Sequence, residues 1–229
     1  MTELVTIAPG VHALENTLRV APGFHLPVRS TLLELAGGGL LMISPLAVDD
    51  ALAARVDALG PVRHIVAPNT LHHLFLNDAA ARWPEAHVHV PRGLPPKLAK
   101  QGRALPRHTL LPEGVPNDVV VIAFEGAPTL EEHVIFHAAS RTLVVTDLVF
   151  HVQDPQGPLT GLILRTVGAH RRLAQSRALR LMIRDKSAAQ RSLEQVLALD
   201  FTRLVMAHGV VVEQDAKAQL REALRHLLP

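Results

Sequence analysis

Side chains that can bind a metal follow three apolar runs of this chain. His72 and His73 lie shortly after one run, Asp147 directly follows a second, and His208 follows a third. The ends of strands are where the loops of an α/β sheet converge and commonly build sites. We therefore expect these side chains to meet at one edge of a sheet.

Imidazoles and a carboxylate suit a divalent metal, with zinc as the first choice and iron or manganese as alternatives. An open position on such an ion lets a water lose its proton near neutral pH. Neighbouring histidines in mid-helix diverge by about 100°, so His72 and His73 must lie at a loop-to-helix turn to share an ion. The chain contains 14 histidines, so some histidines will follow apolar runs without binding a metal. Asp147 could merely cap a turn, and His208 could end a strand without a function.

Three neighbouring polar residues are candidates for contact with a substrate. Asn69 either donates to a substrate or holds its turn through an Asx bond, and the turn is the commoner use. Glu132 and His133 precede an apolar strand beside the expected site, where either could be a further ligand or a general base. Successive residues of a strand point to opposite faces, so only one of the two can face the metal.

The elements that position these residues follow from hydrophobic periodicity and turn signals. The predicted strands are 31–36 and 39–44, forming a hairpin, and 64–67, 87–90, 119–124, 132–137, 142–146 and 203–207. The predicted helices are 49–59, 71–82, 97–103, 169–183, 187–199 and 213–228, and 155–161 is predicted as an exposed loop. Strands followed by helices favour a layered α/β architecture, and no repeat or linker divides the 229 residues, so we expect one domain over 1–229.

Composition narrows the partners. With 48% apolar and 19% charged residues the chain has the composition of a typical globular protein. Only 3% of its residues are aromatic, so few side chains are available to stack on nucleic-acid bases. We expect a small-molecule substrate as partner, and neither nucleic acid nor a membrane, because no apolar run is long enough to span a bilayer. The absence of cysteine and of a signal-like leader makes the cytoplasm the expected compartment. The arginines at 165, 171, 172, 177, 180 and 184 could attract an anionic substrate, although a solvated helix face is the commoner explanation.

The segments VAPNTLHHLFL, SRTLVVTDLVF and RLVMAHG together resemble the metallo-β-lactamase superfamily over about residues 30–229. Within it, the chain resembles a branch described only as a domain of unknown function. The resemblance implies an αββα sandwich of two mixed sheets flanked by helices. It also implies that the superfamily motif His-x-His-x-Asp-His falls on residues 68–73.

By this alignment one of the two metal sites of the superfamily is lost. Its three histidines fall on Pro68, Thr70 and Thr129, none of which replaces them. The neighbouring site is retained as His72, His73, Asp147 and His208, with Asp147 as both ligand and proton acceptor.

The reaction class comes from the resemblance and not from the spacing. It implies a mononuclear metal-dependent hydrolase that acts on an ester, thioester, lactone or phosphodiester. The alternative is a non-catalytic small-molecule-binding protein with a vestigial metal site. Fold alone does not fix the chemistry, and the oligomeric state cannot be read from the sequence.

Overall fold

A computed structural model describes residues 2–157 and 159–228 of the chain. Its strands form a seven-stranded sheet in the order β1-β2-β3-β4-β5-β6-β7 and a four-stranded sheet in the order β11-β10-β9-β8. The strands are β1 (Glu3–Ala8), β2 (Val11–Ala21), β3 (Phe24–Glu34), β4 (Leu40–Ile43), β5 (Val62–Val66), β6 (His87–Val90), β7 (His108–Leu110), β8 (Val119–Ala123), β9 (His133–His137), β10 (Thr142–Val145) and β11 (Arg203–Met206).

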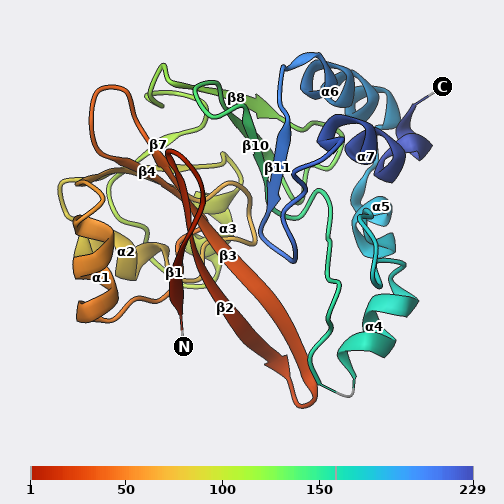
Figure 1. The fold of residues 1–229 in the computed structure, drawn as a ribbon, viewed down its shortest axis with the longest axis horizontal. Coiled ribbons are helices and arrows are strands. Elements are labelled where there is room, and N and C mark those ends of the chain that lie inside the picture. Colours follow the sequence, from red (N-terminus) through yellow and green to blue (C-terminus); the bar gives the residue numbers. More distant parts are fainter. Residues whose placement is uncertain (1, 158, 229) are drawn as a thin grey trace.

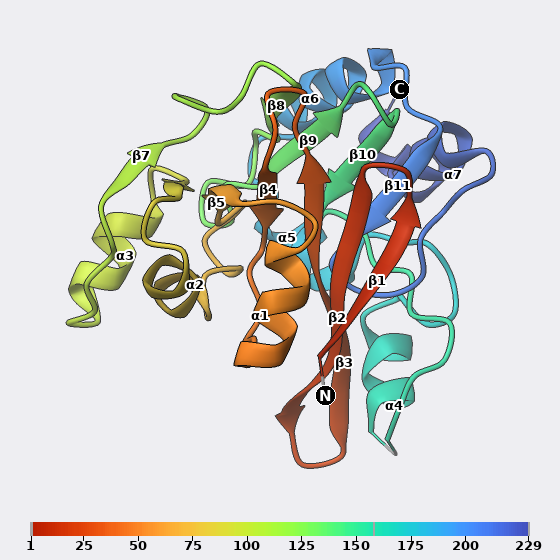
Figure 2. The same ribbon diagram turned by 60° about the vertical axis from the view of Figure 1, so that its left-hand side comes forward.

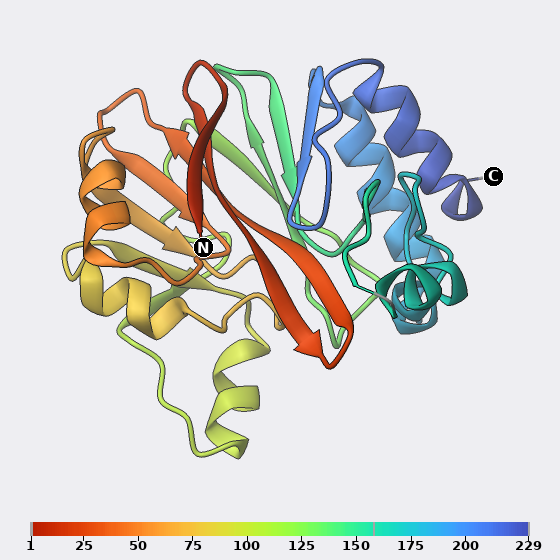
Figure 3. The same cartoon turned by 60° about the horizontal axis from the view of Figure 1, so that its bottom comes forward.

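Helices cover the outer faces of both sheets, α1 to α3 on one side and α6 and α7 on the other (Figures 1 and 3). The helices are α1 (Asp50–Asp57), α2 (Leu76–Arg82), α3 (Leu94–Lys100), α4 (Thr160–Thr166), α5 (Arg177–Met182), α6 (Lys186–Ala198) and α7 (Ala216–Ala223), followed by the short 3-10 helix η1 (Arg225–Leu227). The predicted fold class, an αββα sandwich of two mixed sheets, is confirmed.

Alternation along the buried strands produces the layers. In β9, Ile135 packs between the two sheets, whereas Val134 and Phe136 point to the α6–α7 side. In β3, Leu33 lies between the sheets and Leu32 faces the α1–α3 side. Because both faces of β9 are buried, its centre, Val134 to Phe136, reads as a continuous apolar run in the sequence.

Strand direction places the chemistry-bearing loops at one edge. Strands β4, β5, β6 and β7 run parallel, and in the second sheet β10 runs parallel to β11. The chain segments that follow β4, β5, β10 and β11 therefore leave the two sheets at their carboxyl ends, where they can converge. These are the segments that begin at Ser44, Ala67, Thr146 and Ala207.

The sequence prediction was wrong for the region 155–183. Instead of a loop and one long helix, the structure has α4, a non-helical segment and α5. Gly168 has a positive φ of 76° and ends the first helix, and the Ser176 side chain accepts a hydrogen bond from Leu179 N and begins the second. None of the helices described combines the length and the apolar character that crossing a membrane needs.

Candidate metal centre

Three of the four predicted ligands meet at the sheet edge. His72 Nε2 lies 3.2 Å from Asp147 Oδ2, and His208 Nε2 lies 3.4 Å from Asp147 Oδ1. One ligand atom from each residue lies within 4.8 Å of the others, and this is the single such group of three found among residues 2–157 and 159–228. Asp147 and His208 are buried and His72 is partly buried.

The two imidazoles are oriented by hydrogen bonds at their far nitrogens. His208 Nδ1 lies 2.9 Å from the carbonyl oxygen of Pro27, which can only accept, so Nδ1 carries the proton and donates. His72 Nδ1 lies 2.6 Å from Ser44 Oγ. Both Nε2 atoms therefore face the Asp147 carboxylate, and a partner that fixes the other ring nitrogen is the usual arrangement for a metal-binding histidine.

Close packing of the backbone around His208 keeps it in place. The neighbouring Gly209 has a φ of 113°, and a Cβ there would lie 2.1 Å from the His151 carbonyl oxygen. His151 N donates to the His208 carbonyl at 2.9 Å, and the Phe150 ring stacks on the imidazole with centroids 4.8 Å apart. Only glycine allows the two segments to pass so closely.

Electrostatics gives the centre a fixed negative charge. Burial by itself would raise the pKa of Asp147, but the charge of His72 and hydrogen bonds from His208 and His72 outweigh it and hold the pKa well below its usual range. Burial by itself would lower the pKa of His72, yet the charge of Asp147 and its hydrogen bond raise it. The two pKa changes thus have one cause, the close approach of the His72 imidazole to the Asp147 carboxylate.

The donor set fits a divalent metal. Two imidazole nitrogens and one carboxylate are a common set for zinc, iron or manganese. The two distances, 3.2 Å from His72 Nε2 to Asp147 Oδ2 and 3.4 Å from His208 Nε2 to Asp147 Oδ1, involve different oxygens of the same carboxylate. Both are longer than the ~2.7–2.9 Å of a charge-assisted hydrogen bond.

Asn69 holds both the turn and the carboxylate. Its Oδ1 accepts hydrogen bonds from Leu71 N and His72 N, each at 2.8 Å, which is an Asx turn. Its Nδ2 donates to Asp147 Oδ2 at 2.8 Å and to Glu132 Oε2 at 2.6 Å. Asn69 is 0% exposed, and its amide groups are occupied by these hydrogen bonds. The predicted contact between Asn69 and a substrate therefore does not fit the structure.

Glu132 is a buried support for the centre. It is 1% exposed and accepts hydrogen bonds from the Thr146 backbone N–H at 2.6 Å and the Thr146 hydroxyl at 2.7 Å. Burial, and then the charge of Asp147, raises the pKa of Glu132. Glu132 and His133 were expected to point in opposite directions, and Glu132 is the one that faces the centre.

Truncation of this support should destabilise the protein strongly. Glu132→Ala removes the acceptor of both the buried Thr146 N–H and the Thr146 hydroxyl, and we expect the free energy of unfolding to fall by about 3 kcal/mol. Urea denaturation measures this, and Glu125→Ala, an exposed position before β9, serves as the control. Equal stability of the two variants would contradict a supporting role.

Two predicted residues do not join the cluster. His73 is not a member of the ligand group. Its pKa is lowered by burial and then by the charges of Lys97 and Arg103 on the α3 side, and its buried Nδ1 has no hydrogen-bond partner among the described residues. His133 Nδ1 donates toward the Glu131 and Pro68 carbonyls, 2.9 and 3.3 Å away. The predicted four-ligand set therefore becomes, in the structure, a three-residue cluster.

The positions aligned with the lost histidines are joined by hydrogen bonds. Thr70 Oγ1 donates to the Thr129 carbonyl at 2.8 Å, and His133 N donates to the Pro68 carbonyl at 2.8 Å. Thr70 N also donates to the Leu130 carbonyl at 2.9 Å. The two loops that would flank a second ion are thus bonded directly to each other.

The cluster opens into a pocket of about 210 Å³ with mainly apolar walls. Leu18, Leu26 and Val28 line it from the β2–β3 hairpin, and Leu71, Leu74 and Phe75 line it from the turn before α2. Within the part of the chain that the structure describes, no lysine or arginine lines it. An uncharged group with an apolar tail is the kind of ligand that such walls accept.

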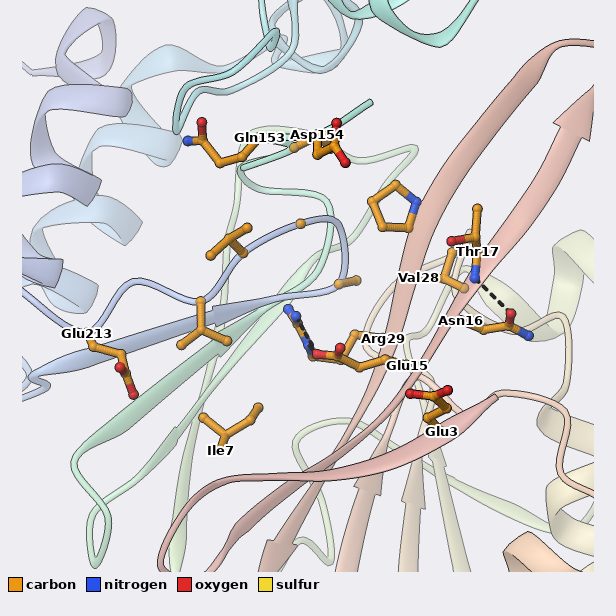
Figure 4. A pocket seen from close by; sticks show the side chains of 16 residues that line it. Glu3, Ile7, Glu15, Asn16, Thr17, Val28, Arg29, Gln153, Asp154 and Glu213 are labelled. Atoms are coloured by element: carbon orange, nitrogen blue, oxygen red, sulfur yellow. Dashed lines mark hydrogen bonds and ion pairs between the residues drawn. The ribbon is translucent and has the colours of Figure 1, made fainter. Parts of the chain in front are cut away.

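A larger and more open hollow of about 670 Å³ lies along β2 and β3 beside Ala207 and Gly209 (Figure 4). Its buried Arg29 donates to Glu15 at 2.6 and 2.8 Å and to the Met206 carbonyl at 2.6 Å. Because Met206 lies two residues before His208, this bond fixes the end of β11 from outside the ligand pocket.

Sequence reasoning missed Ser44, Thr146 and the Pro27 carbonyl. Ser44 directly follows the apolar run 40–43, so the same signal that indicates Asp147 and His208 was available for it. Thr146 was predicted only as the end of a strand. A main-chain carbonyl carries no sequence signal, so the partner of His208 could not be found without the structure.

Comparison with known proteins agrees with this architecture. The family model described as "Domain of unknown function (DUF4336)" matches residues 11–179. A search of curated proteins found no match.

Solved structures of metallo-β-lactamases resemble the whole chain. The enzyme from Pontibacter korlensis is 14% identical with a TM-score of 0.67, and the alignment covers 98% of this chain and 99% of that one. FIM-1 from Pseudomonas aeruginosa, solved in a mono-zinc form, is 14% identical with a TM-score of 0.65, covering 100% and 97%. The enzyme from Erythrobacter litoralis is 12% identical with a TM-score of 0.68, covering 98% and 96%. At such identities the likeness shows the fold alone.

Proposed function

Because the chain belongs to the family described as a domain of unknown function, DUF4336, and has the fold of metallo-β-lactamases, we propose that it is a metal-dependent hydrolase with one divalent ion per chain. The ligands are His72, Asp147 and His208, the metal is zinc, and the compartment is the cytoplasm. The observation that carries the proposal is the convergence of the two Nε2 atoms on one buried carboxylate.

The charge and orientation of the three ligand side chains suit a cation even without one bound. The lowered pKa of Asp147 keeps its carboxylate ionised, so it can bind the ion or accept a hydrogen bond from an attacking water. The Pro27 carbonyl and Ser44 hydroxyl hold the imidazole rings so that their Nε2 atoms face the same point. A metal bound there supplies a Lewis acid that polarises a carbonyl and eases deprotonation of water.

The walls of the pocket favour an acyl substrate. Leucine, valine and phenylalanine side chains surround the mouth, and the described lining includes no lysine or arginine to neutralise a phosphate. Esters, thioesters and lactones, whose acyl groups are uncharged, therefore fit better than phosphodiesters. The apolar residues hold the acyl chain and exclude water from it.

Metal stoichiometry tests the proposal. We expect one equivalent of transition metal after dialysis, measured by elemental analysis and located by anomalous diffraction at His72, Asp147 and His208. His72→Ala should lose the ion, whereas the matched variant His73→Ala should keep it. Two equivalents, or equal loss in both variants, would show that the ligand assignment is wrong.

A second candidate is a non-catalytic small-molecule-binding protein. It is favoured by the direct contacts of His72 and His208 with the Asp147 carboxylate, and by the hydrogen bond between the loops that carry Thr70 and Thr129. This candidate requires no metal, so a purified protein without metal, and with a melting temperature that chelator and added zinc leave unchanged, would establish it in place of the hydrolase.

A further inference from the structure

The segment 155–184 is the most strongly charged part of the chain. It contains six arginines and no aspartate or glutamate, although the whole chain carries a formal charge of only +2. Among residues 2–157 and 159–228, none of these six arginines forms an ion pair with a carboxylate. The positive charge is thus concentrated and left without internal neutralisation.

The arginines crowd one another around α5. Burial and then the nearby charges of Arg172, Arg177 and Arg225 lower the pKa of Arg180. Arg172 and Arg177 donate to main-chain carbonyls, those of Gly168 and Thr166. Like charges held together at a surface favour an anionic partner.

Large leucine side chains protrude among these arginines. Leu181 is 85% exposed and Leu162 is 56% exposed, and Leu159 is exposed too. At α4, the i, i+3 spacing places Leu159, Leu162 and Arg165 along one face. On α5, Arg180 and Leu181 lie three and four residues after Arg177, on the same face of the helix. We call these six residues the α4–α5 surface.

The combination points away from a soluble anion and toward a lipid surface. A phosphate site would enclose its arginines in a cavity, whereas all three arginines of the α4–α5 surface are exposed. Single-stranded nucleic acid would be stacked on aromatic side chains, and these six residues include none. Exposed leucines between basic residues are what a protein uses to insert shallowly into a membrane that carries anionic headgroups.

From this charge complementarity and the protruding leucines, we propose that the α4–α5 surface docks the protein reversibly onto an anionic lipid bilayer. This proposal departs from the sequence-based expectation that a membrane is not a partner, because that expectation considered only membrane-spanning segments and the proposed contact is peripheral.

The position of α4 gives this contact a link to the candidate metal centre. Helix α4 lies beside the turn end of the β2–β3 hairpin (Figures 1 and 2), where Leu159 N donates to the Gly23 carbonyl at 3.0 Å and His25 N donates to Thr160 Oγ1 at 2.9 Å. The same hairpin carries Leu18, which is exposed and lines the ligand pocket. Docking through α4 and the hairpin end would bring the pocket mouth close to the lipid.

Vesicle binding tests the proposal without any need for metal or activity. We expect the full chain to sediment with vesicles of phosphatidylcholine mixed with phosphatidylglycerol and not with pure phosphatidylcholine. Changing Arg165, Arg177 and Arg180 together to glutamine should weaken partitioning on the order of 100-fold, since each basic residue contributes about fivefold near such a surface. The same three residues changed to lysine should retain most of the binding.

The leucines decide between lipid and soluble anion. Leu162→Ser with Leu181→Ser keeps every charge, and we expect at least a roughly tenfold loss of vesicle binding. Changing the exposed Arg55, Arg82 and Arg107 to glutamine removes equal charge outside the α4–α5 surface and should have little effect. Circular dichroism melts check that each variant is folded.

Absence of binding to anionic vesicles would overturn the proposal. So would binding that is insensitive to the leucine variant, or an arginine-dependent complex with inorganic phosphate or RNA of comparable affinity. Since the metal-free chain is sufficient for the assay, its outcome is separate from that of the metal analysis.

Discussion

Replacing Asp147 by asparagine is expected to abolish metal binding while leaving the sandwich folded. Asparagine keeps the shape of the side chain but removes the charge that both Nε2 atoms face at 3.2 and 3.4 Å. We expect metal affinity to fall by more than the ~100-fold that loss of a supporting residue brings. In the metal-free protein the variant loses the carboxylate that the His72 and His208 imidazoles face, and stability should fall by about 2 kcal/mol.

Two measurements separate these effects. Metal content and melting temperature are compared for the parent and Asp147→Asn, with and without chelator, and zinc should raise the melting temperature of the parent alone. Asp78→Asn, at an exposed position on α2, controls for charge removal elsewhere. A variant that retains its ion, together with a parent whose melting temperature is the same with chelator, would rule out the metal centre.

Acidification from about pH 6.5 to about pH 4 is expected to destabilise the protein through His89. This residue is 1% exposed, and its Nε2 lies 3.0 Å from His64 Nδ1. Burial, and then the charge of His64, lowers the pKa of His89 to about 4. In the unfolded chain the imidazole binds a proton below about pH 6.5, so between the two values the unfolded state holds more protons than the folded state and stability falls as pH falls. The full effect is up to about 3 kcal/mol, reached near pH 4.

Urea denaturation at about pH 7 and about pH 5.5 measures the first part of this loss, in a range where aspartate and glutamate titrate little in the unfolded chain. His89→Gln should show a clearly smaller difference between the two pH values than the parent. His87→Gln is a matched control, because His87 lies two residues earlier on the same face of β6 but is exposed. If all three proteins lose the same stability between the two pH values, His89 is not the titrating group.

The candidate site was predictable where it depends on residue type at the end of an apolar run. Asp147 and His208 follow runs that are β10 and β11, and the parallel pairing of those strands brings them together. His73 shows the limit of this reasoning, because sequence adjacency to His72 says nothing about which way each ring turns. The Asx bonds of Asn69 set that direction, and they turn His72 toward Asp147.

The fold was predictable where burial or capping leaves a local signal in the sequence. The helix 49–59 and the strand 87–90 agree with α1 and β6, and Asp49 accepts from Leu52 N as its N-cap position predicts. The strands β1 and β2 were missed because their outer parts are exposed and lack a clean alternation. Helix α2 begins at Leu76 and not at 71, since the preceding residues are committed to the turn that holds His72.

The candidate metal centre takes its residues from both halves of the sandwich. His72 follows β5 of the seven-stranded sheet, whereas Asp147 and His208 follow β10 and β11 of the four-stranded sheet. An occupant bound to all three would therefore act as a clamp between two layers whose facing strands are joined mainly by apolar packing, at residues such as Val66 and Val144. The two sheets could separate only after this occupant had dissociated. Its dissociation rate would therefore limit how fast the backbone amides between the sheets exchange hydrogen with solvent.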